Sequence, residues 1–190
     1  MEEKYIKYIH SDLYRYTTEI SKKLIFKNLL INPGFKYMYA HRKYNYYKEK
    51  NIKLVMYFYK FILYRYRIKY LFEISSKATI GKGFYIGHIG PIIINPNAIL
   101  GDNINISSGV TIGQQNRGIK KGSPIIGSNV FIGANSVIVG NVIIGNNVLI
   151  APCSYVNFDV PDNSIVVGNP GKIKRDLNAT YGYIGSILKD

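Results

Sequence analysis

Apolar residues recur every six positions in the second half of the chain. The series begins at Ile80 and Ile86, slips by two residues, and continues from Ile94 to Ile112; after a longer interruption it runs unbroken from Ile126 to Val156. A six-residue period is typical of a parallel β-helix, in which three hexads, each with one strand and one corner, close a coil of about 18 residues. The pattern therefore predicts a mainly β chain whose anchor side chains stack inward as a continuous apolar column.

Small and turn-forming residues fill the rest of the hexads. A second series precedes most anchors by two positions, at Ala98, Ile104, Val110, Val130, Ser136, Val142, Val148 and Ser154. Asn and Asp gather between the predicted strands, at Asp102-Asn103, Ser128-Asn129 and Asn146-Asn147. Among residues other than glycine, these tolerate left-handed backbone best, so we expect the pairs to form corners of the coils.

The first half of the chain has a helical pattern. Residues 51–72, NIKLVMYFYKFILYRYRIKYLF, mix apolar and basic positions at spacings near three and four, as in an amphipathic helix. The break at Asn32-Pro33-Gly34 separates two earlier helical stretches. We therefore predict an α-helical N-terminal region over 1–72, a β-helix over 73–175 with a protruding loop at 114–124, and a C-terminal tail over 176–190.

Positive charge is concentrated in the predicted helical region. Residues 1–72 hold 16 Lys and Arg against 5 Asp and Glu, and 14 of the 18 tyrosines. Two interpretations are open for residues 51–72. Either their aromatic face packs on other helices or another subunit, or they lie on an anionic membrane surface with Lys53, Lys60, Arg65, Arg67 and Lys69 near the headgroups. No nucleic-acid-binding motif accompanies the charge, so nucleic acid is not an expected partner.

Length and composition exclude several other classes of protein. The chain has 190 residues, enough for one domain with a core. It has no apolar run of 18 residues to predict a transmembrane helix, and its start, MEEKYIKYIHSD, lacks the pattern of a signal peptide. The single cysteine, Cys153, excludes an internal disulfide and is expected to pack as a small buried residue. The expected location is cytoplasmic, or at the inner face of the membrane.

Five stretches resemble the serine acetyltransferase branch of the hexapeptide acyltransferases. They are NPGFKYMYAHR, ATIGKGFYIGH, NISSGVTIG, PIIGSNVFIGANSVIVGNVIIG and DVPDNSIVVGNPGKI, all between Asn32 and Ile173. The resemblance implies a left-handed β-helix and an acyltransferase that uses acetyl-CoA. It also implies a homotrimer or a dimer of trimers, with acetyl-CoA in the groove between neighbouring β-helices.

His88 is the only histidine between Glu73 and the C-terminus. A buried histidine held by backbone carbonyls is one interpretation. The resemblance implies another, because the family's catalytic histidine occupies this place and acts as general base on the acceptor hydroxyl, a task that suits imidazole at neutral pH. In the family an aspartate fifteen residues earlier orients the imidazole. Glu73 has that position here, and it either orients His88 or is a surface residue.

Two departures from the family pattern concern the acceptor. Relatives that acetylate serine have an aspartate directly before the histidine and an Arg-His pair before a loop proline; this chain has Gly87 and Gly122-Ser123. Each missing hydrogen bond to a charged group of serine would cost about 1.5–3 kcal/mol. We therefore expect a neutral acceptor, most plainly a sugar hydroxyl. The expected substrate-binding residues are Gly87, Gln114, Asn116, Arg117 and Ser123.

The resemblance also implies where CoA binds. Lys172, Lys174 and Arg175 follow the last coil and suit the phosphates of CoA. Gly113, Gly133 and Ala134 leave room for the pantetheine arm. No metal is expected, since the zinc-dependent carbonic anhydrases of this superfamily need three histidine ligands and only His88 lies in the β-helix.

The expected function is acetyl transfer from acetyl-CoA to a sugar hydroxyl of a surface polysaccharide or its precursor. A serine acetyltransferase of cysteine synthesis with an altered clamp stays open as an alternative. So does a non-enzymatic β-helix scaffold whose helical region binds a partner or a membrane. A nucleotidyltransferase would need a Gly-rich nucleotide-binding segment before the β-helix, which the first 72 residues lack.

Overall fold

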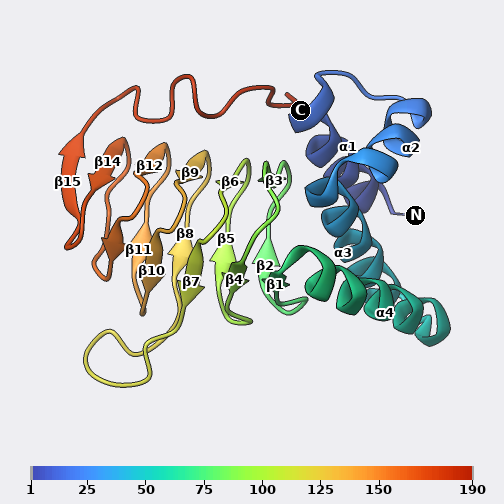
Figure 1. The fold of residues 1–190 in the computed structure, drawn as a ribbon, viewed down its shortest axis with the longest axis horizontal. Coiled ribbons are helices and arrows are strands. Elements are labelled where there is room, and N and C mark those ends of the chain that lie inside the picture. Colours follow the sequence, from blue (N-terminus) through green and yellow to red (C-terminus); the bar gives the residue numbers. More distant parts are fainter. Residues whose placement is uncertain (1, 190) are drawn as a thin grey trace.

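The computed structural model describes residues 2–189, in which helices precede a stack of short strands (Figure 1). The helices are α1 (Glu3–Thr17), α2 (Lys22–Ile31), α3 (Pro33–Glu49) and α4 (Lys53–Tyr70). The strands are β1 (Phe72–Ile74), β2 (Thr79–Ile80), β3 (Tyr85–Ile86), β4 (Ile92–Ile94), β5 (Ile99–Leu100), β6 (Asn105–Ile106), β7 (Thr111–Gly113), β8 (Ile125–Ile126), β9 (Val130–Ile132), β10 (Val137–Val139), β11 (Ile143–Ile144), β12 (Val148–Ile150), β13 (Tyr155–Val156), β14 (Ser164–Val167) and β15 (Lys172–Arg175).

Three sheets form the sides of a β-helix. Their strand orders are β1-β4-β7-β10-β13, β11-β8-β5-β2 and β15-β14-β12-β9-β6-β3. Paired strands are parallel and lie one coil apart, as where Ile94 pairs with Ile112 and Ile112 with Ile138. Only β14 and β15, within the described residues, pair antiparallel. The predicted mainly β fold of hexapeptide coils is confirmed.

Both apolar series point into this β-helix. The anchors from Ile80 to Val156 are at most 5% exposed, and the smaller residues from Ala98 to Ser154 at most 1%. At the corners, Asn103, Asn129 and Asn147 have the predicted left-handed backbone, with φ between 52° and 57°. The prediction for Cys153 is wrong: it is exposed, with φ of 61°. It takes the corner position that Asn135 holds one coil earlier, and a corner side chain does not enter the core.

The helical region contains four helices where the sequence pattern indicated three stretches. The break at Asn32 separates α2 from α3, as expected. The break between α1 and α2 was missed. There Thr18 has left-handed backbone with φ of 58°, and Ser21 caps α2 by accepting a hydrogen bond from Leu24 N at 3.2 Å. Among the described residues, no helix has both the length and the hydropathy needed to cross a membrane.

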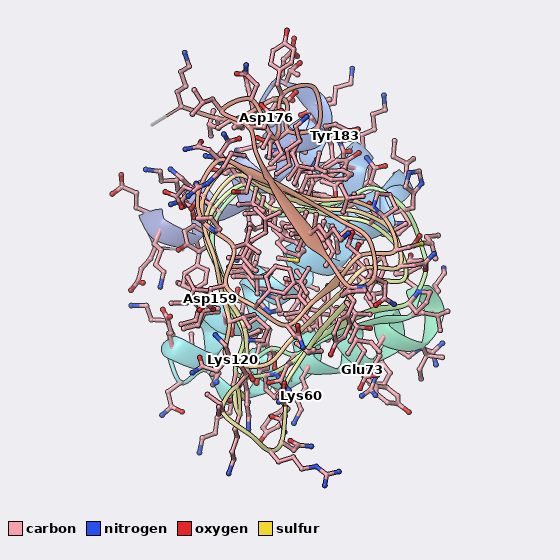
Figure 2. All side chains as sticks on the ribbon, turned by 90° about the vertical axis from the view of Figure 1, so that its left-hand side faces the viewer. Lys60, Glu73, Lys120, Asp159, Asp176 and Tyr183 are labelled. Atoms are coloured by element: carbon pink, nitrogen blue, oxygen red, sulfur yellow. The ribbon has the colours of Figure 1, made fainter. Side chains whose placement is uncertain are left out.

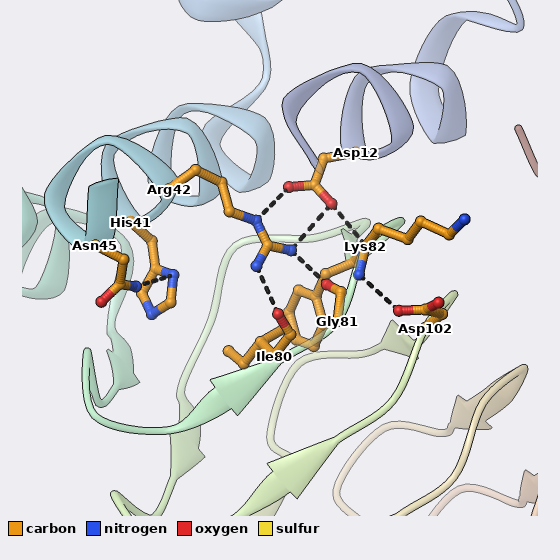
Figure 3. Close-up of polar contacts among 9 residues, drawn as sticks. Asp12, His41, Arg42, Asn45, Ile80, Gly81, Lys82 and Asp102 are labelled. Atoms are coloured by element: carbon orange, nitrogen blue, oxygen red, sulfur yellow. Dashed lines mark hydrogen bonds and ion pairs between the residues drawn. The ribbon is translucent and has the colours of Figure 1, made fainter. Parts of the chain in front are cut away.

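A buried ion pair fastens the helices to the first coil (Figure 3). Arg42 of α3 donates to Asp12 of α1 through Nε at 2.9 Å and Nη2 at 3.2 Å, and both side chains are almost fully buried. Arg42 Nη1 also donates to the carbonyl of Ile80 at 2.7 Å, and Phe84 N donates to Asp12 at 2.9 Å. One charge pair therefore connects α1 and α3 with β2 and with the residue before β3.

The C-terminal tail covers one side of the β-helix. It returns along the six-stranded sheet, where Tyr183 contacts the ring of Phe131 and its carbonyl accepts from Asn105 Nδ2 at 2.7 Å. Figure 2 shows Tyr183 and Asp176 on the side of the molecule opposite Glu73 and Lys120. Within residues 2–189, no segment runs along the five-stranded or the four-stranded sheet in this way.

Candidate active site

His88 lies at the corner between β3 and β4, and its side chain is exposed. The strand before it is held by Tyr16 of α1, whose hydroxyl donates to Ile86 O at 3.0 Å and accepts from Ile86 N at 3.1 Å. Burial raises the pKa of Tyr16, so the hydroxyl stays protonated and can do both. On the other side, Gly90 N donates to the carbonyl of Tyr70 at 3.3 Å. The corner that carries His88 is therefore fixed by α1 and by the end of α4.

The imidazole of His88 has no hydrogen-bond partner in the described part of the chain. The interpretation of His88 as a buried histidine held by carbonyls is therefore wrong, since the side chain is exposed. An exposed imidazole at a rigid corner is free to accept a proton from a bound hydroxyl. Its role as a base stays a prediction.

Glu73 is exposed on the five-stranded sheet and is paired with Arg67. The Arg67 Nη2 to Glu73 Oε1 distance is 2.7 Å, and no hydrogen bond joins Glu73 to His88 among residues 2–189. Together with Ile93, Asn95 and Gly113, this pair lines a cavity of about 380 Å³ on the sheet. Of the predicted residues, Glu73 and Gly113 are thus brought to one groove. The orienting role of Glu73 stays a prediction.

Gly87 directly precedes His88 and lies against an aromatic ring. A Cβ at this position would be 3.2 Å from Cε1 of Tyr85. An acidic side chain there would have to share its space with that ring, so the surroundings of Gly87 suit a small residue.

The predicted loop follows β7 and is tied down at two places. Gln115 and Gly122 form an antiparallel bridge, and Lys120 Nζ lies 2.9 Å from Asp159 Oδ2. At its base a chain of hydrogen bonds connects neutral side chains. Ser123 Oγ donates to Asn95 Oδ1 at 3.0 Å, and Asn95 Nδ2 donates to Gln114 Oε1 at 3.4 Å. Gln114 Nε2 donates to Asn116 Oδ1 at 2.6 Å.

Except for Asn95, these neutral side chains line a second cavity, of about 340 Å³, which the cation Lys121 also lines. Gln114, Asn116 and Ser123 all contribute to it, as predicted substrate-binding residues, whereas Arg117 does not. Asn95 was missed by sequence reasoning, and it connects this cavity to the groove beside Glu73. Neutral donors and acceptors of this kind match sugar hydroxyls better than the charges of an amino acid.

Of the residues predicted to bind CoA, Gly133, Ala134 and Lys172 lie along the edge of the β-helix that carries His88, whereas Gly113 ends β7 at the opposite edge of the five-stranded sheet and Arg175 lies at the far end of β15. Gly133 and Ala134 form the corner after β9, two coils from His88, and Lys172, Lys174 and Arg175 are exposed on β15 beyond the last coil. Adjacent strands are about 4.8 Å apart, so the sheet extends about 24 Å from β3, which precedes His88, to β15. Gly133 also has a packing role, because a Cβ there would be 2.6 Å from Pro152 N.

His88 and the loop lie on opposite edges of the same sheet. His88 precedes β4, and Gln114 follows β7, in strands of three residues. Such a strand spans about 10 Å, so one small acceptor cannot contact both within a single chain. In the described part of the chain, no group of three or more His, Cys, Asp or Glu side chains is arranged to hold a metal ion.

Comparison with known proteins agrees with this architecture. The bacterial transferase hexapeptide model (six repeats) matches residues 123–157. A colanic acid biosynthesis acetyltransferase by name, WcaB of Escherichia coli (strain K12), is 43% identical over 116 residues, covering 60% of this chain and 70% of WcaB. The chain belongs to the hexapeptide acyltransferases. It is an acyltransferase of their serine acetyltransferase-like branch, with a left-handed β-helix.

Solved acyltransferase structures extend the likeness to the helices. The serine acetyltransferase of Neisseria gonorrhoeae has a TM-score of 0.73 and 30% identity, over 100% of this chain and 68% of that one. The serine acetyltransferase of Brucella abortus in complex with coenzyme A has a TM-score of 0.71 and 25% identity, over 91% and 67%. The helical region is therefore part of the shared fold, although its sequence has no hexapeptide period.

Proposed function

We propose that this acyltransferase transfers an acetyl group from acetyl-CoA to a hydroxyl of a sugar, in a surface polysaccharide or its precursor. One observation carries the choice of acceptor: Gln114, Asn116 and Ser123 supply neutral donors and acceptors to the cavity below the loop, where, among the described residues, Lys121 is the one charged lining residue and no carboxylate lines it. Family members that acetylate serine are expected to have a charged clamp there. The likeness to WcaB, whose name assigns it to colanic acid biosynthesis, supports a polysaccharide.

His88 acts as the general base in this proposal. Its imidazole takes the proton of the acceptor hydroxyl while that oxygen attacks the thioester carbonyl of acetyl-CoA. Backbone N–H groups are the simplest donors to the oxyanion of the tetrahedral intermediate. When the intermediate collapses, the C–S bond breaks and the imidazolium returns the proton to the CoA thiolate. Glu73 is proposed to orient the imidazole once the bound acceptor has displaced its contact with Arg67.

The acyl donor is proposed to lie along the edge that carries His88. Lys172, Lys174 and Arg175 would pair with the phosphates of CoA at the far end. The pantetheine arm would pass Ala134 and reach the thioester carbonyl near His88. The coenzyme A complex of the Brucella abortus enzyme supports acetyl-CoA as co-substrate.

The complete site is proposed to form between two copies of the chain in a homotrimer. In a ring of copies, the edge with His88 on one β-helix can face the loop of the next. Ile99, Ile125 and Ile143 are 40–58% exposed in a row on the four-stranded sheet, and their burial would favour such an assembly.

Release of the CoA thiol from acetyl-CoA tests the proposal. The acceptors are L-serine and the methyl glycosides of glucose, galactose and N-acetylglucosamine. We expect release with a sugar but not with serine, and about a 10²–10⁴-fold loss in His88→Ala. His10→Ala, in α1 and lining neither cavity, is the matched control and should keep its activity.

The alternatives predict different results. Because the chain is similar to serine acetyltransferases, serine is the second candidate for the acceptor. Fast release of the CoA thiol with serine and with no sugar would overturn the proposal of a sugar acceptor. A scaffold predicts no release with any acceptor and no binding of acetyl-CoA in calorimetry, which would overturn the enzymatic proposal as a whole.

A further inference from the structure

Helix α4 has two apolar faces, and the structure covers only one of them. Leu63 and Tyr70 are buried, and Tyr59, Ile62 and Tyr66 pack partly against the same core. The opposite face is open to solvent. Its apolar side chains are each more than half exposed: Leu54, Tyr57, Phe58, Phe61, Tyr64 and Ile68. Contiguous exposed apolar surface of this extent marks an interaction site.

Basic residues flank the open face on both sides. At about 100° per residue, the exposed apolar side chains form one stripe, centred opposite the buried face. Lys53, Lys60 and Arg67 lie along one border of the stripe, where Arg67 is also paired with Glu73 of β1. Lys69 lies along the other border, and Arg65 lies just inside it. Helix α4 contains no Asp or Glu. An apolar stripe between two rows of cations is the arrangement of helices that lie in the plane of a bilayer, with acyl chains below and anionic headgroups beside them.

We propose that α4 binds the surface of an anionic lipid bilayer through this open face. Charge complementarity favours lipid over a second copy of the chain. In a two-fold contact each copy presents the same patch, so Lys53, Lys60, Arg65 and Lys69 of one α4 would face the same four cations of the other, with no carboxylate from either helix between them. An anionic bilayer matches the open face in both respects, because its acyl chains can bury the apolar stripe and its headgroups can pair with the cations.

The position of α4 connects this surface to the candidate active site. The helix extends away from the first coil (Figure 1), and at its C-terminal end the carbonyl of Tyr70 accepts a hydrogen bond from Gly90 N, two residues after His88. Leu71, next after α4, is 55% exposed and its carbonyl accepts from Ile92 N at 3.1 Å. A bilayer against α4 would thus lie beside the corner that carries His88. Acceptors carried on a lipid would reach the enzyme from that side.

Vesicle co-sedimentation of the full chain tests the proposal. The vesicles are phosphatidylcholine alone, and phosphatidylcholine mixed with phosphatidylglycerol. We expect binding only to the anionic vesicles, weakening as salt is raised. Phe61→Asp and Arg65→Glu/Lys69→Glu should each weaken it at least tenfold. Each variant has a matched control that should bind as the wild type does. The control for Phe61→Asp is Leu177→Asp on the tail, and the control for Arg65→Glu/Lys69→Glu is Lys77→Glu/Lys189→Glu, which has the same change of charge.

Three results would overturn the proposal. In the first, the wild type does not bind anionic vesicles. In the second, Phe61→Asp binds them as well as the wild type does. In the third, the control variants lose as much vesicle binding as the α4 variants lose. If Phe61→Asp formed a smaller assembly than the wild type in light scattering and still bound vesicles, the open face would instead be an interface with a second copy of the chain. Acetyl transfer to a water-soluble acceptor should be unchanged in Phe61→Asp, so the membrane proposal can fail without the proposed function failing. A circular dichroism spectrum like that of the wild type confirms that each variant folds.

Discussion

The β-helix and the helical region are stabilised in different ways. In the β-helix the same position of each hexad is buried, so each coil repeats the contacts of the coil before it. The helical region packs on the first coil through a non-repeating apolar core and adds single buried polar contacts, the Asp12–Arg42 pair and the Tyr16 hydroxyl. A repeated core spreads its stability over many residues, whereas a single buried contact concentrates it. Substitutions in the two regions should therefore differ in kind.

Removing Asp12 should have the largest effect on stability. Asp12→Ala leaves the buried guanidinium of Arg42 without its carboxylate, and breaking a buried pair in this way costs about 3–5 kcal/mol. Urea unfolding followed by circular dichroism measures the loss. Lys4→Ala breaks the exposed Lys4–Glu49 pair, at 3.4 Å, and should cost less than about 1 kcal/mol. Similar losses in the two variants would show that the buried pair does not hold the helices on the β-helix.

Truncating one anchor of the column should have the next largest effect. Ile132 is fully buried in β9, and Ile132→Ala should reduce the free energy of unfolding by about 2–5 kcal/mol. Ile119→Ala in the exposed loop is the control, expected within about 0.5 kcal/mol of the wild type. Equal stability of Ile132→Ala and wild type in urea would contradict a continuous packed column.

Tyr16→Phe tests whether the helices position the active site. Losing the hydroxyl leaves Ile86 N and O without their partner, at a cost of about 1–3 kcal/mol. Because Ile86 lies two residues before His88, kcat should also fall, while the KM for acetyl-CoA stays unchanged. Tyr14→Phe, on the same helix, is the control. A loss of stability with unchanged kcat would limit Tyr16 to a structural role.

The smallest effect depends on pH and concerns His41 of α3. Burial, and then the neighbouring Arg42, lower the pKa of His41 to about 3. The folded state therefore keeps His41 neutral, whereas the unfolded chain protonates it below a pKa of about 6.5. The free energy of unfolding is thus unaffected by His41 above that pH and decreases as the pH falls from about 6.5 toward 3. By pH 5 the loss should reach about 2 kcal/mol. His41→Gln should flatten this dependence in urea titrations at several pH values, and a slope unchanged from the wild type would contradict it.

The hexapeptide period was sufficient to predict the β-helix, because a repeated spacing leaves one arrangement that buries every anchor. It also placed the loop and the corner that carries His88. The break at Thr18 could not be predicted, since no Gly or Pro marks it. The contacts of Tyr16, Asp12 and Asn95 could not be predicted either, because each joins residues that lie 19 to 72 positions apart in the sequence. Such pairings depend on how the helices pack, and one sequence does not contain that information.

Subunit mixing tests the central claim most directly, namely that His88 of one copy acts with the loop of the next. His88→Ala and Gln114→Ala/Asn116→Ala would each be assayed alone for acetyl transfer and then after unfolding and refolding together. If the copies form a ring, about a quarter of the interfaces in mixed assemblies combine an intact histidine with an intact loop. The mixture should then recover activity well above that of either variant. Activity no higher than the sum of the two variants would contradict a site shared between copies.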